Sequence, residues 1–281
     1  MIYDKNGQRL MNVYGADGNS LLRAYDSDGE IIFTPKIKIM AYNVGQWYTG
    51  DHVNVPESEE DAYYALQGGI IERNDPDILL LEEYTAQFGE SGKTALSLLS
   101  AYPYRHTITD GSATNGLQRA VFSKFPIKRY TEHNYISVYY YDSCVINDDI
   151  FLCIVHLPWN NRANRISCAN IMLEDAQTSG YKYFIFGGDF NTADYYDTTG
   201  ADYAVIQPFI TAGCHVANGT NFGFIPTYSD YSDMTDYQCL DNIITSPNIT
   251  ILDAYTDNTK ATDDIIAKID HLPFIAELQF N

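Results

Sequence analysis

Long hydrophobic runs are missing from this sequence. No apolar stretch approaches the roughly 18 residues that a membrane-spanning helix requires. The first ten residues, MIYDKNGQRL, lack the basic and apolar regions of a secretory signal peptide. We therefore expect a soluble protein without a transmembrane segment or signal peptide.

Basic residues are also scarce. Lys and Arg total 17 against 37 Asp and Glu, which gives a formal net charge of −20 at pH 7. This excess repels polyanions, so we do not expect tight nonspecific binding of nucleic acid unless basic groups cluster locally or metal ions intervene.

Motifs of several enzyme classes do not occur. The five cysteines have no CxxC or zinc-like spacing, and Cys153 lies in the apolar run FLCIV, where a buried thiol is expected. There is no P-loop, no GxGxxG and no nucleophilic Ser or Cys motif. These absences argue against a disulfide framework, a zinc site and covalent catalysis.

An internal repeat occupies residues 1–34. Asn-Gly or Asp-Gly pairs suit tight hairpin turns between short strands, and the runs lack the full acidic ladder of a calcium loop. So short a segment can rarely bury a core alone. We expect three β-turn units that lie outside the catalytic fold and serve docking or self-association. The positions that recur every 11 residues are Tyr3, Tyr14 and Tyr25; Gly7, Gly18 and Gly29; and Leu10, Leu21 and Ile32.

Residues 35–281 have a different pattern, in which buried strands alternate with helices and strand-strand hairpins. Such a pattern predicts an α/β sandwich of two sheets rather than a Rossmann order. Helices are expected at 58–73, 92–102, 162–177 and 205–213. Strands are expected at 37–44, 76–84, 105–109, 118–123, 137–141, 143–147, 150–157, 182–188, 238–246, 249–256 and 273–280.

Polar residues at the ends of these strands are the candidates for chemistry, because strand ends present side chains to clefts. Taken singly, each has an ordinary explanation as a turn former or a solvated charge. Taken together, their hard oxygen donors suit Mg²⁺ or Mn²⁺ and favour metal-assisted attack of water on phosphorus. They are Asn43, Glu82, Glu83, His156, Asp189, Asn191, Asp241, Asp270 and His271.

The order of the motifs adds a specific resemblance. The series YNV, PDILLLEE, VFSKFPI, IVHLPWNN, GGDFNT, LDNIITS and IDHLPFIAEL resembles the endonuclease/exonuclease/phosphatase superfamily of DNase I, exonuclease III and neutral sphingomyelinases. It covers about residues 36–281, and GDFN and the closing D-H-x-P are its most diagnostic pieces. It implies a four-layered α/β sandwich with the site at the strand ends between the sheets.

The resemblance also implies metal ligands. Asn43 and Glu83 correspond to the family's metal-binding pair, with Glu83 rather than Glu82 at the position of the family glutamate. Asp270 would help to hold a metal ion, which we expect to be Mg²⁺ or Mn²⁺.

Catalytic roles follow from the same resemblance. Asp189 would align or deprotonate the attacking water, and Asn191 would hold that water or a phosphate oxygen. His271, oriented by Asp241, would donate to the phosphate in the transition state, and His156 is a candidate general acid for the leaving oxygen.

One departure affects this assignment: Asn242 follows Asp241 where the family usually has an aromatic residue. It weakens the expectation that Asp241 orients His271.

The substrate is less constrained. Arg162 and Arg165 lie just beyond His156 and are candidates for contacting a nucleic-acid backbone, which favours a DNase I-like nuclease. The alternative is a sphingomyelinase-like or inositol-phosphate phosphodiesterase or phosphatase, which would act on phospholipid or inositol phosphate. Trp47, Tyr48 and Trp159 are loop aromatics available for membrane docking, but no long apolar hairpin accompanies them. A binding protein without catalysis is disfavoured because every catalytic position is filled.

Overall fold

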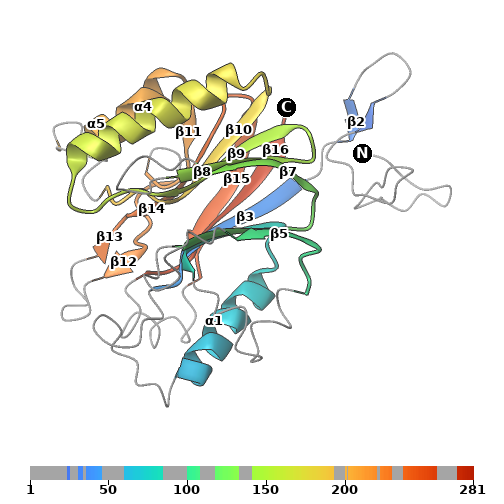
Figure 1. Cartoon of the computed structure of the whole chain (residues 1–281), viewed down its shortest axis with the longest axis vertical. Coiled ribbons are helices and arrows are strands. Elements are labelled where there is room, and N and C mark those ends of the chain that lie inside the picture. Colours follow the sequence, from blue (N-terminus) through green and yellow to red (C-terminus); the bar gives the residue numbers. More distant parts are fainter. Residues whose placement is uncertain are drawn as a thin grey trace.

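Two six-stranded sheets stack face to face and form the body of the protein (Figure 1). The first sheet has the strand order β15-β16-β3-β4-β6-β5, and the second has the order β11-β14-β10-β9-β8-β7. The computed structural model describes residues 24–25, 31–33, 36–45, 60–84, 100–107, 118–132, 141–192, 200, 202–219, 222–229, 237–257 and 271–281.

The strands of the first sheet are β3 (Lys36–Asn43), β4 (Ile78–Tyr84), β5 (Tyr104–Thr107), β6 (Gln118–Ser123), β15 (Ile249–Thr256) and β16 (Phe274–Phe280). Those of the second are β7 (Ile127–Glu132), β8 (Tyr141–Ile146), β9 (Ile150–His156), β10 (Tyr183–Asp189), β11 (His215–Val216) and β14 (Asp241–Thr245). A small separate pair consists of β12 (Tyr228–Ser229) and β13 (Tyr237–Gln238).

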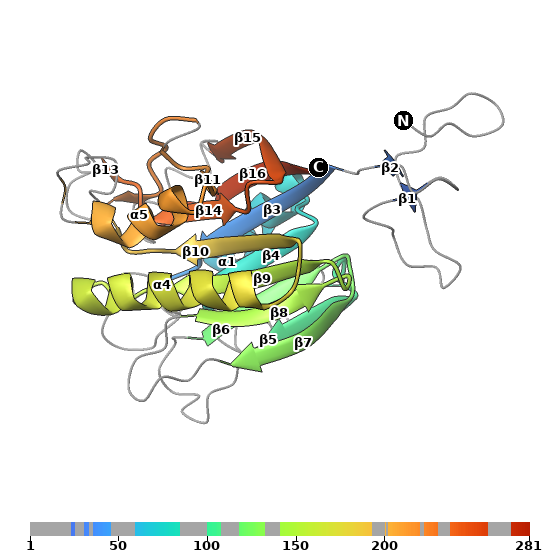
Figure 2. The ribbon, with the colours of Figure 1, turned by 90° about the horizontal axis from the view of Figure 1, so that it is seen from above.

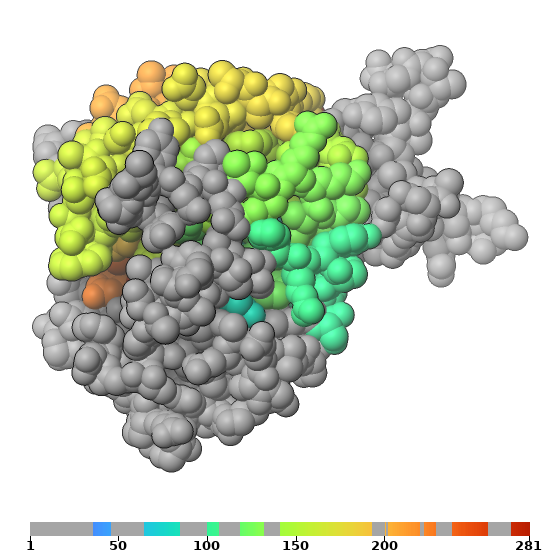
Figure 3. Space-filling view, viewed as in Figure 1, coloured from blue at the N-terminus to red at the C-terminus, as the bar shows by residue number. Residues whose placement is uncertain are grey.

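Helices cover the outer faces of the two sheets. Helix α1 (Glu60–Asn74) lies over the first sheet, and α4 (Arg162–Thr178) and α5 (Tyr203–Thr211) lie over the second (Figures 1 and 2). The outer side of α4, in yellow-green and yellow, forms part of the molecular surface in Figure 3. The chain therefore has four layers, as expected for the α/β sandwich. Among the described helices, none is long and apolar enough to cross a membrane.

Three apolar clusters hold the layers together. The largest, around Ile39, Leu80 and Ile185, fills the space between the sheets. Another packs α1 on the first sheet, and a third packs α4 and α5 on the second. Central strands buried on both faces explain the continuous apolar runs, such as ILLL in β4 and IFLCIV in β9.

The described part of the repeat segment is short. Strands β1 (Ala24–Tyr25) and β2 (Ile31–Phe33) pair antiparallel within the third repeat unit. Figures 1 and 2 draw this pair beside the two six-stranded sheets rather than within either of them. The first two repeat units, residues 92–99 of the helix expected at 92–102 and residues 137–140 of the strand expected at 137–141 lie outside the described residues.

Candidate active site

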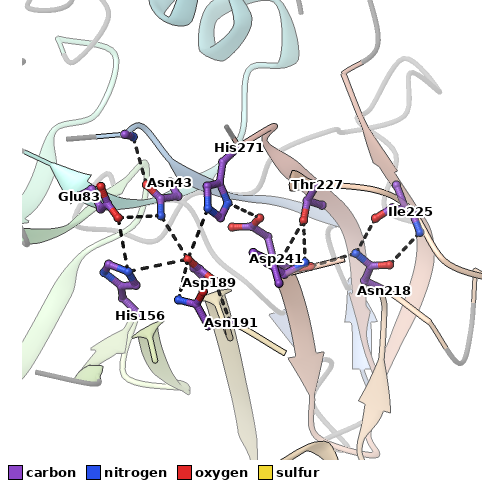
Figure 4. A network of polar contacts seen from close by, with 12 residues as sticks. Asn43, Glu83, His156, Asp189, Asn191, Asn218, Ile225, Thr227, Asp241 and His271 are labelled. Atoms are coloured by element: carbon purple, nitrogen blue, oxygen red, sulfur yellow. Dashed lines mark hydrogen bonds and ion pairs between the residues drawn. The ribbon is translucent and has the colours of Figure 1, made fainter. Parts of the chain in front are cut away.

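Five strands carry the candidate residues to one place because of how they pair. Strands β3 and β4 are parallel and set Asn43 opposite Glu82, and the parallel β9 and β10 set His156 opposite Asp189. Strand β14 runs antiparallel to β10 and places Asp241 opposite Asp189. The carboxyl ends of the two parallel pairs thus meet across the gap between the sheets (Figure 4).

A β-bulge turns Glu83 towards this meeting point. Leu80 packs between the sheets and Leu81 packs under α1, so regular alternation would direct Glu83 towards α1. Instead, the β4–β6 register shifts between Leu81 and Tyr84, and Glu83 has a φ of +53°. Such a bulge re-aims a side chain next to a functional site. The Oε1 atom of Glu83 lies 3.4 Å from Asn43 Nδ2 and 3.6 Å from His156 Nε2.

Glu82 lies in the same bulge but is fully buried. Its side chain is 0% exposed, and neither carboxylate oxygen has a hydrogen-bond partner among the described residues. Burial, together with Asp241 and Asp189, raises the pKa of Glu82 well above its usual value. A neutral carboxylic acid is therefore expected here.

Two glycines before Asp189 allow close approach, Gly187 to the opposite sheet and Gly188 to the neighbouring strand β9. A Cβ atom on Gly187 would lie 2.5 Å from Leu80 Cδ1 of the opposite sheet. Gly188 has a φ of +137°, and a Cβ atom there would lie 2.0 Å from the carbonyl oxygen of Val155. The two glycines of the GGDFN sequence therefore permit close packing directly before Asp189 and Asn191.

Asp189 lies at the centre of the polar network in Figure 4. Its Oδ2 atom accepts hydrogen bonds from Asn43 Nδ2 at 3.2 Å and from Asn191 Nδ2 at 3.1 Å, and its Oδ1 accepts one from the Asn191 backbone N–H at 2.8 Å. His271 Nε2 and His156 Nε2 lie 3.7 Å and 3.8 Å from Oδ2. Burial raises the pKa of Asp189 to about 7, although His271 and the hydrogen bonds oppose the rise.

Asp241 contacts the His271 ring at Nδ1, on the side away from Asp189. The Nδ1 atom of His271 lies 2.8 Å from Asp241 Oδ2, which leaves Nε2 on the side of Asp189. The expected orienting contact is therefore present despite the unusual Asn242. That residue exchanges hydrogen bonds with the backbone of Asn218 and so ties β14 to the next loop.

Sequence analysis missed two residues that fix the Asp241 backbone. Thr227 Oγ1 accepts the N–H groups of Leu240 and Asp241, at 3.1 and 3.0 Å. Asn218 Nδ2 donates to the Asp241 carbonyl at 3.0 Å. Both residues are fully buried, but they lie in loops with no motif that marks them. Only the fold brings them together.

His156 is nearly buried on the other side of the site. Burial, with Arg119 and His271 nearby, lowers the pKa of His156 to about 3, so the free site holds a neutral imidazole. Arg119 itself is 2% exposed and pairs through Nε with Asp142 Oδ2 at 2.5 Å, joining the two sheets. Sequence analysis did not anticipate this ion pair.

The carboxylates of Glu83 and Asp189 fit a hard divalent cation, whereas Asn43 Oδ1 accepts the Gly45 N–H at 3.1 Å and would have to turn towards them to bind it. The amide nitrogen of Asn43 lies between the carboxylates of Glu83 and Asp189, where their negative charges converge. Mg²⁺ needs only one or two carboxylates, with water and substrate oxygens completing its shell. Among the described residues, no group of three or more His, Cys, Asp or Glu side chains is arranged so that those side chains alone could hold a metal ion. Asp270, the third expected ligand, lies outside the described residues.

The two candidate substrate arginines differ in placement. Arg165 is buried: its guanidinium donates to the carbonyls of Pro158 and Trp159 and pairs with Asp202 at 2.5 Å. This placement favours a role in holding the loop after His156 over direct contact with a substrate. Arg162 has 53% of its side chain exposed and pairs with the same Asp202 at 3.1 Å.

Comparison with protein families shows to which family the chain belongs. The sequence profile of the Endonuclease/Exonuclease/phosphatase family matches residues 64–263. The chain belongs to the Endonuclease/Exonuclease/phosphatase family. Members of this family are hydrolases of phosphoester bonds and are generally dependent on divalent metals. Comparison with curated proteins found no significant match.

Solved structures of the Endonuclease/Exonuclease/phosphatase fold superpose over most of the chain. A family member from Bacteroides vulgatus has a TM-score of 0.66 and 15% identity, covering 88% of this chain and 100% of its own. Truncated TDP2 from Caenorhabditis elegans gives 0.59 and 14%, covering 88% and 98%. The 3′ phosphatase NExo from Neisseria, bound to a product DNA hairpin, gives 0.61 and 16%, covering 87% and 99%. At these identities the likeness concerns the fold.

Proposed function

We propose that this protein is a phosphodiester hydrolase that requires Mg²⁺ or Mn²⁺ and cleaves nucleic acid by direct attack of water on phosphorus. The observation that carries the proposal is the position of Asp189. One buried carboxylate lies within 4 Å of two histidines and accepts hydrogen bonds from two asparagines, at the strand ends where the two sheets meet.

Asn43 and Glu83 would hold the cation, with Asp270 as a further ligand from the segment before His271. A cation there would supply charge to polarise a phosphate oxygen and neutralise its developing charge. The cation would also reduce the electrostatic repulsion between the carboxylates of Glu83 and Asp189. Such a cation would explain why these carboxylates lie so close together.

Asp189 would take a proton from, or align, the attacking water. A pKa near 7 is well matched to a general base at neutral pH. Asn191 holds Asp189 in place through its backbone N–H and its side-chain amide, and the strained positive φ of Asn191, +49°, sets that geometry. These bonds and the one from Asn43 occupy three of the four lone-pair positions of the carboxylate, and the fourth, on Oδ1, would accept the water molecule.

The two histidines would contact the phosphate group. Asp241 would hold the His271 ring through Nδ1, so that Nε2–H of the imidazolium can donate to a phosphate oxygen in the transition state. The lowered pKa of His156 favours a neutral imidazole that donates an N–H hydrogen bond. Delivery of a proton from His156 to the leaving oxygen requires the substrate's negative charge to raise that pKa.

The preference for nucleic acid rests on chemistry near the site and on the solved relatives. Arg162 presents an exposed guanidinium at the start of the helix that follows His156, where it can reach a phosphate next to the cleaved one. The Neisseria structure contains DNA as its product. The alternative is a sphingomyelinase-like or inositol-phosphate hydrolase with the same catalytic set.

A substrate panel tests the proposal. Single-stranded DNA, RNA, plasmid DNA, sphingomyelin vesicles and inositol phosphates would each be incubated with Mg²⁺ and with EDTA. We expect metal-dependent cleavage of at least one nucleic acid. Cleavage confined to the lipid or the inositol phosphates would establish the alternative, and hydrolysis of none of them would overturn the proposal.

Arg162 provides a sharper test of the nucleic-acid preference. Replacing Arg162 with Ala should raise KM for DNA and reduce the slope of log(kcat/KM) against log[salt] by about one unit for each lost phosphate contact. Lys128→Ala is a matched control, because Lys128 has a similarly exposed, ion-paired side chain at the opposite end of the strands. Equal effects of the two substitutions would refute the contact.

A further inference from the structure

The loop between β9 and α4 presents an exposed indole just beyond His156. Trp159 is 78% exposed, and Phe224 at 47% is the other exposed large hydrophobic side chain among the described residues. A single exposed apolar residue is ordinary on its own. The unusual feature is the set of buried hydrogen bonds that hold the backbone of this loop.

Buried hydrogen bonds fix this loop from both sides. Arg165, whose side chain is 6% exposed, donates from Nη1 to the carbonyl oxygens of Pro158 at 3.0 Å and Trp159 at 2.8 Å. Asn191 Nδ2 donates to the Leu157 carbonyl at 2.8 Å, and the Leu157 N–H donates to the Asp189 carbonyl at 2.9 Å. The backbone that carries the indole is thus anchored to the catalytic strands, so little entropy is lost when a ligand contacts it.

Trp159 is close to the reaction centre along the chain. Trp159 lies three positions after His156, so their Cα atoms lie within roughly 11 Å even for a fully extended backbone. The indole can therefore meet a group attached to a phosphate that is bound at His156. Asn160, Asn161 and Arg162 follow it, so its exposed neighbours in the sequence are hydrogen-bonding or charged side chains.

The polar and charged residues next to Trp159 distinguish between three possible ligands: a lipid bilayer, duplex DNA and an unpaired base. Insertion into a lipid bilayer requires a patch of apolar side chains, whereas the exposed residues that follow Trp159 in the described loop are two asparagines and an arginine. Duplex DNA keeps its bases stacked on one another and carries dense charge, which a protein of net charge −20 repels. An unpaired base offers a bare π face for stacking and polar edges for the neighbouring amides.

We propose that Trp159 is a stacking platform for an unpaired nucleobase adjacent to the cleaved phosphate. The preferred substrate is then a single-stranded segment or an unpaired end rather than duplex DNA. This inference rests on the proposed function and adds a base-binding subsite to it.

Kinetics on two matched substrates test the subsite. One is a single-stranded oligonucleotide, and the other has the same length and phosphates but abasic residues beside the cleavable bond. We expect Trp159→Ala to lower the ratio of kcat/KM for the base-containing over the abasic substrate by about tenfold or more, and Trp159→Phe to retain part of the preference. Phe224→Ala, the matched control, should leave the ratio at its wild-type value. An unchanged ratio in Trp159→Ala, or a loss equal on both substrates, would overturn the proposal.

A binding measurement separates this inference from the catalytic one. In EDTA, the base-containing oligonucleotide should quench the tryptophan fluorescence of the full chain. Quenching should persist in Trp47→Phe and be lost in Trp159→Phe, while the abasic oligonucleotide should cause none. Quenching by vesicles of a zwitterionic choline lipid instead of the oligonucleotide would contradict the base-binding role. If the wild-type protein hydrolyses no phosphoester, the proposed function fails, but this measurement still decides the subsite.

Discussion

Asp189 combines two demands that oppose each other. Catalysis in the proposed function needs an ionised carboxylate, whereas burial at 1% exposure favours the neutral acid and raises its pKa to about 7. The surrounding asparagines and His271 reduce this conflict without removing it. Active-site carboxylates commonly trade stability for reactivity in this way.

Replacing Asp189 with Asn should therefore separate activity from stability. We expect kcat to fall by about 10²-fold or more, because the group acts in the transition state. In EDTA, the stabilising contribution of a neutral Asp189 is present below its unfolded pKa of about 4 and is lost as the pH rises through about 7. The melting temperature of Asp189→Asn should thus increasingly exceed that of the wild type between these pH values.

Two controls accompany that comparison. Mg²⁺ should narrow the difference in melting temperature, because a cation stabilises the ionised carboxylate of the wild type. A difference that does not change between pH 4 and pH 7 would show that burial does not perturb Asp189 as described.

His271 offers a second prediction at the same scale. His271→Ala should lower kcat by about 10²-fold or more while KM changes little, because its Nε2–H acts mainly on the transition state. Asp241→Asn should produce a smaller loss, since His271 would remain but lose its charged partner. Circular dichroism would verify folding in both variants, and a near-wild-type kcat for His271→Ala would refute its role.

At the scale of elements, the pairing of strands brings the site residues together, and local sequence does not determine that pairing. The apolar runs predicted most central strands, and the expected strand 249–256 coincides with β15. The pairing between them depends on contacts distant in sequence, and this pairing brings Asn43 beside Glu83 and Asp189 beside His156. The motif resemblance supplied that arrangement in advance, whereas hydrophobic periodicity alone did not.

The elements that were not predicted have physical reasons. Strand β7, IKRYTE, has few apolar residues because it lies at the edge of its sheet, and β11 has only two residues. The bulge at Glu82 and Glu83 also leaves no sequence signal, since neither residue is a glycine. The buried roles of Asn218 and Thr227 depend on tertiary contacts in the same way.

Gly188 tests how closely the strands must pack. Gly188→Ala should destabilise the fold by several kcal/mol, because the added Cβ would lie 2.0 Å from the Val155 carbonyl oxygen and the residue has a positive φ. Gly180→Ala is a suitable control, since Gly180 also has a positive φ but nothing lies within 4 Å of its added Cβ. Urea denaturation would measure both, and equal losses would show that backbone strain alone, without the steric contact, explains the effect.

At the scale of the whole molecule, the role of the repeat segment 1–34 in docking or self-association remains a prediction. In the described residues, β1 pairs with β2 and neither strand joins a six-stranded sheet. Starting the chain at Pro35 should leave phosphodiesterase activity within about a factor of three, a barrier change under roughly 1 kcal/mol. Sedimentation should reveal a change in self-association. Loss of folded, active protein would show instead that the repeats complete the core.

The most direct test of the central claim is the metal dependence of phosphodiester hydrolysis at this one site. The rate on a single-stranded oligonucleotide would be measured for the wild type with Mg²⁺, with EDTA, and after Mg²⁺ or Mn²⁺ is restored, with His271→Ala as the control for contaminating nucleases. The account predicts a loss of about 10²-fold or more in EDTA, recovery when the metal is restored, and little activity in the variant. Full activity in EDTA, or equal activity of the variant and the wild type, would contradict it.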